Sequence, residues 1–124
     1  MDAPNRPQPT QKVWGETVRV SNDAYVWFAR IRPGGYSSKH YHPTQINEFH
    51  VIHGHFVVKL FDKVGEQLVQ VREVLIPPGT TYSVPAGVWH QFYAHSGVGV
   101  IETYIGEIEN GVDIIRADVG GLDQ

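Results

Sequence analysis

Turn-forming glycine and proline residues interrupt this chain at roughly ten-residue spacing from residue 33 onward, and this limits the fold more than any other feature. Glycine adopts backbone angles closed to other residues and proline lacks an amide hydrogen, so both end regular structure. With 13 glycines and 8 prolines in 124 residues, no segment keeps a helical period. The interruptions are Pro33-Gly34-Gly35, His53-Gly54-His55, Lys63-Val64-Gly65, Pro77-Pro78-Gly79, Pro85-Ala86-Gly87 and Ser96-Gly97.

The segments between these turns are rich in β-branched and aromatic residues, which favour strands. The predicted strands are 18–20, 24–32, 37–42, 47–53, 56–61, 68–76, 81–84, 91–94 and 98–105. Residues 112–116 fit either one more strand or a short turn of helix. Many short strands in this arrangement indicate an all-β protein, either a closed antiparallel β-barrel or a jelly roll.

The length of the chain, 124 residues, predicts a single domain with one core. Residues 1–12 contain three prolines and few apolar side chains, so we expect an extended N-terminal arm. We expect the barrel to occupy residues 13–118 and a C-terminal tail to occupy residues 119–124.

The charge and composition narrow the classes of partner and compartment. The net charge of −3 offers no basic surface for nucleic acid or an anionic membrane. The absence of cysteine excludes disulfides and thiolate chemistry and fits a reducing compartment. No apolar run approaches the length of a membrane span, and the first residues do not resemble a signal peptide. We therefore expect a cytoplasmic protein whose partner is a small-molecule ligand.

Three of the seven histidines are spaced for metal binding. His40 and His42 are two residues apart, so their side chains share one face of a strand. His90 follows the turn at Pro85 and Gly87 and reaches the same place from a neighbouring strand. Three neutral imidazoles that converge on one point bind a first-row transition metal. Zinc, iron, manganese and nickel all accept such ligands, so the pattern predicts one divalent ion without identifying it.

Two segments around these histidines resemble the two sequence motifs of the cupin superfamily. The matching positions of the first are Gly34, His40, His42 and Gly54, and those of the second are Gly79, Pro85, Gly87 and His90. The second motif usually ends in asparagine, where this chain has Ala94. The resemblance implies a cupin-type antiparallel β-barrel (jelly roll) with a metal site in its interior, and commonly a homodimer. The flanking segments are most similar to the cupin domain of type II mannose-6-phosphate isomerases, which implies a related activity on a sugar or sugar phosphate.

The chain departs from the first motif where that motif usually has a glutamate ligand. It has Asn47 there, followed by Glu48, and strand alternation lets only one of the two face the interior. Phe49 and Val51 share a face with Asn47, so we favour Asn47 inward and Glu48 outward. A bulge after Pro43 would reverse this register and make Glu48 the fourth ligand.

Other polar residues near the motifs are candidates for substrate binding. Gln91 and Tyr82 lie close to His90 in the pattern, and Arg30 and Arg32 share one strand face where they could meet a phosphate or carboxylate. The aromatic residues Tyr25, Trp27, Phe28, Phe92, Tyr93 and Tyr104 are expected to fill the core or an interface.

Three functions remain open from the sequence. The first is a metal-dependent isomerase or epimerase of a sugar or sugar phosphate, in which the ion polarises a carbonyl and a nearby base moves the proton. The second is an iron(II) dioxygenase with three histidine ligands, and the third is a non-catalytic module that binds a metal or a sugar. No residue of the sequence stands out as the base that the first function needs.

Overall fold

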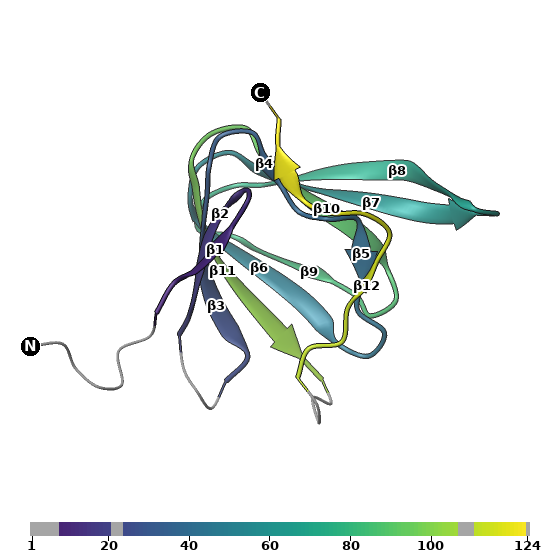
Figure 1. The fold of residues 1–124 in the computed structure, drawn as a ribbon, viewed down its shortest axis with the longest axis horizontal. Helices are drawn as coiled ribbons and strands as arrows, with labels where there is room; N and C mark the ends of the chain where they lie inside the picture. The colour runs from purple at the N-terminus through teal and green to yellow at the C-terminus, as the bar shows by residue number, and fades with distance from the viewer. Residues whose placement is uncertain (1–7, 21–23, 107–110, 124) are drawn as a thin grey trace, which may run out of the picture.

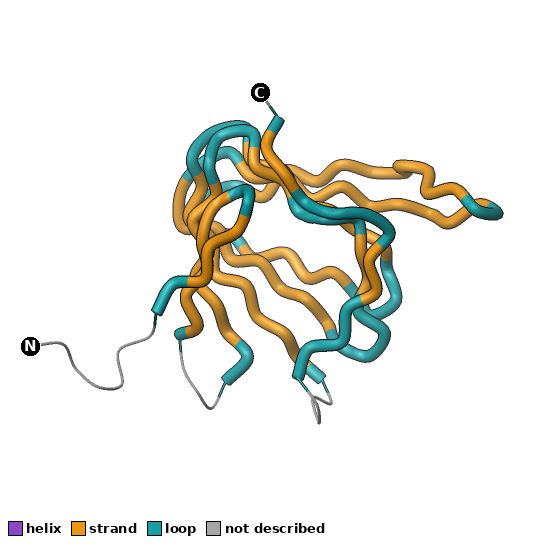
Figure 2. Tube along the Cα trace, viewed as in Figure 1, coloured by secondary structure: helices purple, strands orange, loops and turns teal. Residues whose placement is uncertain are grey.

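The computed structural model describes residues 8–20, 24–106 and 111–123. These residues form two antiparallel β-sheets that face each other around one core, so the prediction of an all-β jelly roll is confirmed (Figure 1). Strands and loops account for all of the described chain (Figure 2). In that part of the chain there is no helix long and apolar enough to cross a membrane.

The first sheet has six strands. In spatial order they are β1 (Thr10–Lys12), β2 (Gly15–Arg19), β3 (Val26–Ile31), β11 (Val98–Ile105), β6 (Ile46–His53) and β9 (Thr81–Val84). The central pair, β11 and β6, places Tyr104 opposite Asn47 and Val100 opposite Val51. This register decides which side chains of the two strands meet in the interior.

The second sheet is built around β10 (Trp89–Ala94). Its other members are β12 (Ile115–Arg116), β5 (His40–Tyr41), β4 (Gly35–Tyr36), β13 (Gly121–Leu122), β7 (Phe56–Val64) and β8 (Gln67–Ile76). The strands β5 and β4 pair with different parts of β10, and β7 also pairs with β10 and with β8. The β7–β8 hairpin extends away from the rest of the barrel (Figure 1).

Two predicted segments differ from the structure. Of the predicted strand 37–42 only β5 (His40–Tyr41) is a strand, and β4 (Gly35–Tyr36) precedes the predicted segment; at Ser37 the side-chain hydroxyl accepts the Phe92 N–H bond (3.0 Å) in place of a backbone carbonyl. The ambiguous segment 112–116 contains a strand, β12, and no helix. The strands β1 and β13 also give structure to the end of the expected arm and to part of the expected tail, while residues 1–7 and 124 lie outside the described residues.

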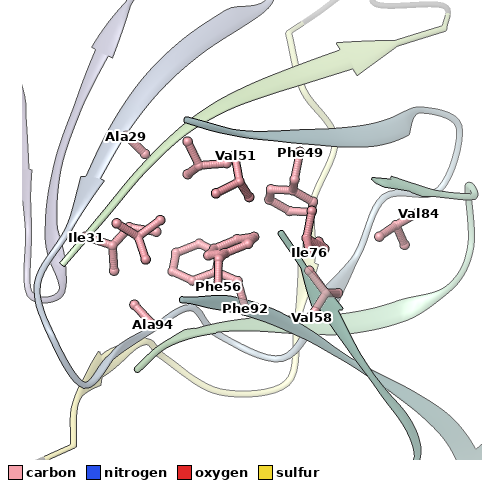
Figure 3. Packing of buried hydrophobic residues seen from close by; sticks show 12 residues of the cluster. Ala29, Ile31, Phe49, Val51, Phe56, Val58, Ile76, Val84, Phe92 and Ala94 are labelled. Atoms are coloured by element: carbon pink, nitrogen blue, oxygen red, sulfur yellow. The ribbon is translucent and has the colours of Figure 1, made fainter. Parts of the chain in front are cut away.

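The apolar core lies between the two sheets at one end of the barrel (Figure 3). Phe49, Phe56 and Phe92 meet there with ring centroids 5.4 to 6.4 Å apart. Each such buried aromatic contributes on the order of 2 kcal/mol through the hydrophobic effect. The remaining members are Ala29, Ile31, Val51, Val58, Ile76, Val84, Ala94, Val98 and Val100.

The inward-facing residues change from apolar to polar along three strands. On β6 the buried series is Val51, Phe49 and Asn47, and on β10 it is Ala94, Phe92 and His90. On β11 the residues after Val98 and Val100 on the same face are Glu102 and Tyr104, by strand alternation. The polar ends of the three strands therefore lie next to the core and form the wall of a separate site.

Candidate metal centre

The structure brings the three predicted histidines together. His40 on β5 lies directly opposite His90 on β10, and His42 follows β5 by one residue. The ring centroids are 4.4 Å apart for His40 and His90, 5.0 Å for His40 and His42, and 5.4 Å for His42 and His90. One ring nitrogen from each lies within 4.8 Å of the others. The three rings are thus grouped closely enough to hold a single ion.

Backbone carbonyls orient all three rings. Each Nδ1 atom lies next to one carbonyl oxygen: Ser38 for His40 (2.8 Å), Asp113 for His42 (2.8 Å) and Val88 for His90 (2.9 Å). A carbonyl oxygen only accepts hydrogen bonds, so each Nδ1 carries a hydrogen and donates it. In the neutral rings, Nε2 then keeps its lone pair for another partner. This is the usual arrangement of metal-binding histidines.

Burial keeps these imidazoles neutral. It lowers the pKa of His40 to about 2, with further lowering by the neighbouring His90 and His42. Burial likewise lowers the pKa of His90 to about 4 and lowers that of His42. At neutral pH the cluster presents unprotonated nitrogens, the form that binds metal ions.

Asn47 faces the cluster and Glu48 does not. Asn47 is completely buried, and its Oδ1 lies 3.1 Å from Nε2 of His90. Glu48 is on the other side of β6, where its Oε2 accepts a hydrogen bond from Ser83 Oγ (2.6 Å). The structure therefore places Glu48 away from the cluster, because no bulge reverses the strand register between Asn47 and Phe49.

The polar atoms of the site fit a cation. Because Nδ1 of His90 donates its hydrogen to the Val88 carbonyl, Nε2 of the neutral ring is an acceptor. The Asn47 oxygen beside it is an acceptor as well. Nε2 of His42 and Nδ2 of Asn47 are buried and have no hydrogen-bond partner among the described residues. A divalent ion bound by His40, His42 and His90 would give Nε2 of His42 a partner and would remove the repulsion between the neighbouring acceptors of His90 and Asn47.

Two residues that the sequence analysis did not propose for the site stand beside it on β11. Glu102 and Tyr104 face the interior, and the Tyr104 hydroxyl donates a hydrogen bond to Glu102 Oε1 (2.5 Å). The Tyr104 ring also contacts the His42 ring (centroids 4.9 Å apart). The signal in the sequence was the alternation Val98, Val100, Glu102, Tyr104, which continues the inward face of a strand into polar residues.

The interior location of this pair changes its acid–base properties. Burial raises the pKa of Glu102, and the Tyr104 hydroxyl, the Asn47 amide and the charge of Lys12 partly oppose this effect. Burial and the adjacent Glu102 raise the pKa of Tyr104 well above its ordinary value. The pair therefore places an exchangeable proton next to the histidine cluster.

A cavity of about 470 Å³ opens beside the cluster. His40, Glu102 and Tyr104 line it together with Trp27, Lys12 and Arg116. The volume is in the range of small-molecule sites. His40 of the cluster and the Glu102–Tyr104 pair can thus be reached from one ligand-sized space.

The substrate-binding candidates from the sequence do not line this cavity. Gln91 lies on the opposite face of β10 from His90 and donates a hydrogen bond to the Ser37 carbonyl (3.0 Å). Tyr82 packs against the apolar core. Arg30 and Arg32 are exposed, because Ala29 and Ile31 occupy the inward positions of β3. The structure thus places none of these four candidates in the lining of this cavity.

Comparisons with known proteins agree with this fold. The family model of the cupin domain matches residues 27–102. A search of curated proteins found no match. Three similar solved structures are the capsular polysaccharide assembling protein CapF from Staphylococcus aureus, oxalate decarboxylase from Bacillus subtilis and vicilin from Capsicum annuum.

These three structures share the fold at low sequence identity. The identity, TM-score and covered share of this chain are 18%, 0.68 and 95% for CapF, 17%, 0.65 and 90% for the decarboxylase, and 16%, 0.67 and 92% for vicilin. This chain spans 33%, 30% and 33% of the respective proteins, about a third of their length. The likeness therefore extends to about a third of each larger chain.

Proposed function

The chain belongs to the cupin family, and we propose that it is a metal-dependent enzyme that isomerises or epimerises a small hydroxy-carbonyl compound such as a sugar or sugar phosphate. The observation that carries the proposal is the Glu102–Tyr104 pair in the cavity that His40 also lines. This reaction class needs a metal site and a group that moves a proton next to it. The cavity offers candidates for both.

His40, His42 and His90 would hold the divalent ion. When bound, the ion would polarise the substrate carbonyl and make the adjacent C–H bond more acidic. Asn47 would stay beside the ion as a neutral neighbour, because its oxygen faces His90. With only neutral ligands, the ion would keep its full charge toward the substrate.

Glu102 is the residue that we assign to proton transfer. The Tyr104 hydroxyl holds Oε1 of Glu102, which leaves Oε2 for a substrate proton. Tyr104 also packs edge-on against Trp27 (centroids 5.5 Å apart), so the hydroxyl has a fixed position. Tyr104 thus acts as a positioning residue for the carboxyl group.

The first test is elemental analysis of untagged protein and of the His90→Ala variant. We expect about one zinc, manganese, nickel or iron per chain in the wild type and none in the variant. Full metal retention in the variant would contradict the site. Iron together with oxygen consumption would favour the dioxygenase, and a metal-loaded protein that binds sugars without turnover would favour the binding module.

The second test measures proton transfer directly. The metal-loaded protein is incubated in heavy water with aldoses, ketoses and their phosphates, and deuterium incorporation next to the carbonyl is followed by NMR. Glu102→Gln should slow the exchange by about 100-fold or more while the metal content stays unchanged. The matched control is Glu48→Gln on the outer face, which should exchange like the wild type. Equal loss in both variants would contradict the assignment.

The expected homodimer and cytoplasmic location stay predictions. Trp27, one of the aromatic residues expected to fill the core or an interface, lines the cavity, and its neighbour Phe28 is half-buried.

A further inference from the structure

We propose that the substrate carries an anionic group, a carboxylate or a phosphate, and that Arg116 binds it at the edge of the cavity. This inference rests on the proposed function, because it concerns the ligand of the same cavity. It names the class of substrate, a small hydroxy-carbonyl compound with one anionic end, and the residue that selects it.

The register of two strands places Arg116 next to the metal centre. Arg116 on β12 lies directly opposite His40 on β5. Residues that are directly opposite in an antiparallel pair extend their side chains to the same face, with Cβ atoms about 5 Å apart. Both side chains line the cavity. A ligand that reaches His40 therefore passes within range of the guanidinium group.

Arg116 has no acidic partner in the described part of the chain. Its side chain is exposed, and no described carboxylate lies within ion-pair distance of it. The nearest acidic residue on its own segment, Asp118, accepts the backbone N–H bond of Lys39 (2.6 Å). An arginine without an acid beside it, facing a cavity, keeps its five donors for a ligand.

Lys12, the second cation of the cavity, differs from Arg116 because its charge acts on a carboxyl group. Lys12 lines the same cavity, and its charge acts on Glu102, where it opposes the effect of burial on the carboxyl pKa. The charge of Arg116 instead affects His40 and Tyr104. Burial is the main cause of the lowered pKa of His40, and the Arg116 charge lowers it further. The same charge opposes the rise in the pKa of Tyr104. Arg116, beside the metal centre, is therefore the cation of the cavity that has no carboxylate partner among the described residues.

This arrangement gives the two ends of a substrate separate positions. The anionic end would form charge-assisted hydrogen bonds with the flat guanidinium fork, which matches carboxylate and phosphate geometry. The carbonyl end would then lie toward His40, and the C–H bond between them toward Glu102. Neutral sugars would lack the first contact and bind more weakly.

The test is calorimetric binding of inorganic phosphate, glycolate and, as a neutral ligand, glycerol. Each is titrated into the protein as purified and into protein stripped of metal and dialysed. Phosphate and glycolate represent the two sources of negative charge, and the stronger of the two identifies the anionic group. We expect at least one anion to bind both preparations, and Arg116→Gln to weaken it by about tenfold or more.

The matched control is Arg30→Gln, which removes an exposed arginine from the outer face of β3. Loss of anion binding in Arg116→Gln with wild-type binding in Arg30→Gln would support the proposal. Equal binding by wild type and Arg116→Gln would overturn it, and so would binding that requires the metal and ignores Arg116. In either of those cases, the metal content and the deuterium exchange of neutral sugars would still decide the proposed function separately.

Discussion

Acid should destabilise the metal-free protein through its buried histidines. His40 and His90 have pKa values of about 2 and about 4 in the folded state, lowered mainly by burial, against an ordinary value near 6.5. The unfolded chain therefore takes up protons at a higher pH than the folded chain does. Stability is full above about pH 6.5 and falls as the pH drops below that value, down to about pH 4 for His90.

The size of the effect follows from these pKa values. Between about pH 7.5 and pH 5, each of the two histidines lowers the free energy of unfolding by about 2 kcal/mol, or about 4 kcal/mol together. Both side chains are at most 6% exposed, so solvent screens little of this effect. His42, whose pKa is also lowered, adds to the loss in the same direction.

The assay is urea unfolding of chelator-treated protein at several pH values, followed by tryptophan fluorescence. Between about pH 7.5 and pH 5, the free energy of unfolding of His90→Gln should fall by about 2 kcal/mol less than that of the wild type, because the variant lacks one of the titrating groups. The control His53→Gln removes an exposed histidine and leaves the cluster intact. A wild-type loss no larger than that of His90→Gln would refute the reasoning that the cluster is buried and neutral.

Two substitutions test the surroundings of the centre and the fold that supports it. Asn47→Asp places a carboxylate among the neutral histidines and should tighten metal binding by about tenfold or more, measured by competition with a chelating dye, whereas weaker binding would argue against an inward Asn47 beside the ion. Gly54→Ala should lower the free energy of unfolding by more than about 1 kcal/mol, because Gly54 has a φ of +97° and a Cβ there would lie 2.2 Å from the Gly97 oxygen. The control Gly97→Ala has open space around its added Cβ, so equal losses in urea unfolding would contradict this explanation.

The fold and the histidine cluster could be predicted because both depend on local patterns. Turn residues mark the ends of strands, and a two-residue spacing places His40 and His42 on one face. The same alternation, applied to Phe49 and Val51, favours the inward position that the structure gives to Asn47.

The rest of the cavity depends on pairing between distant strands. Nothing near Glu102 in the sequence shows that β11 lies beside β6, so its carboxyl group could not be placed near the histidines. Arg116 reaches the site only because the C-terminal segment returns to pair with β5, across more than seventy residues of sequence. Arg30 and Arg32, by contrast, look suitable for an anion in the sequence, but Arg30 is exposed on the outer face of β3 and Arg32 is exposed directly after that strand. The order of the strands in the sheets decides which arginine reaches the cavity, and local sequence patterns do not contain that order.

The division of the barrel into an apolar and a polar end links stability to function. Along β6, β10 and β11 the same strands that bury Val51, Ala94 and Val98 carry the site residues four or six positions away. The core can thus hold the strand register that brings Tyr104 opposite Asn47. The polar end by itself is unfavourable, since among the described residues it leaves two buried polar atoms, Nε2 of His42 and Nδ2 of Asn47, without a hydrogen-bond partner. A metal ion bound there would relieve that cost, so metal binding should stabilise the fold as well as prepare the site for its substrate.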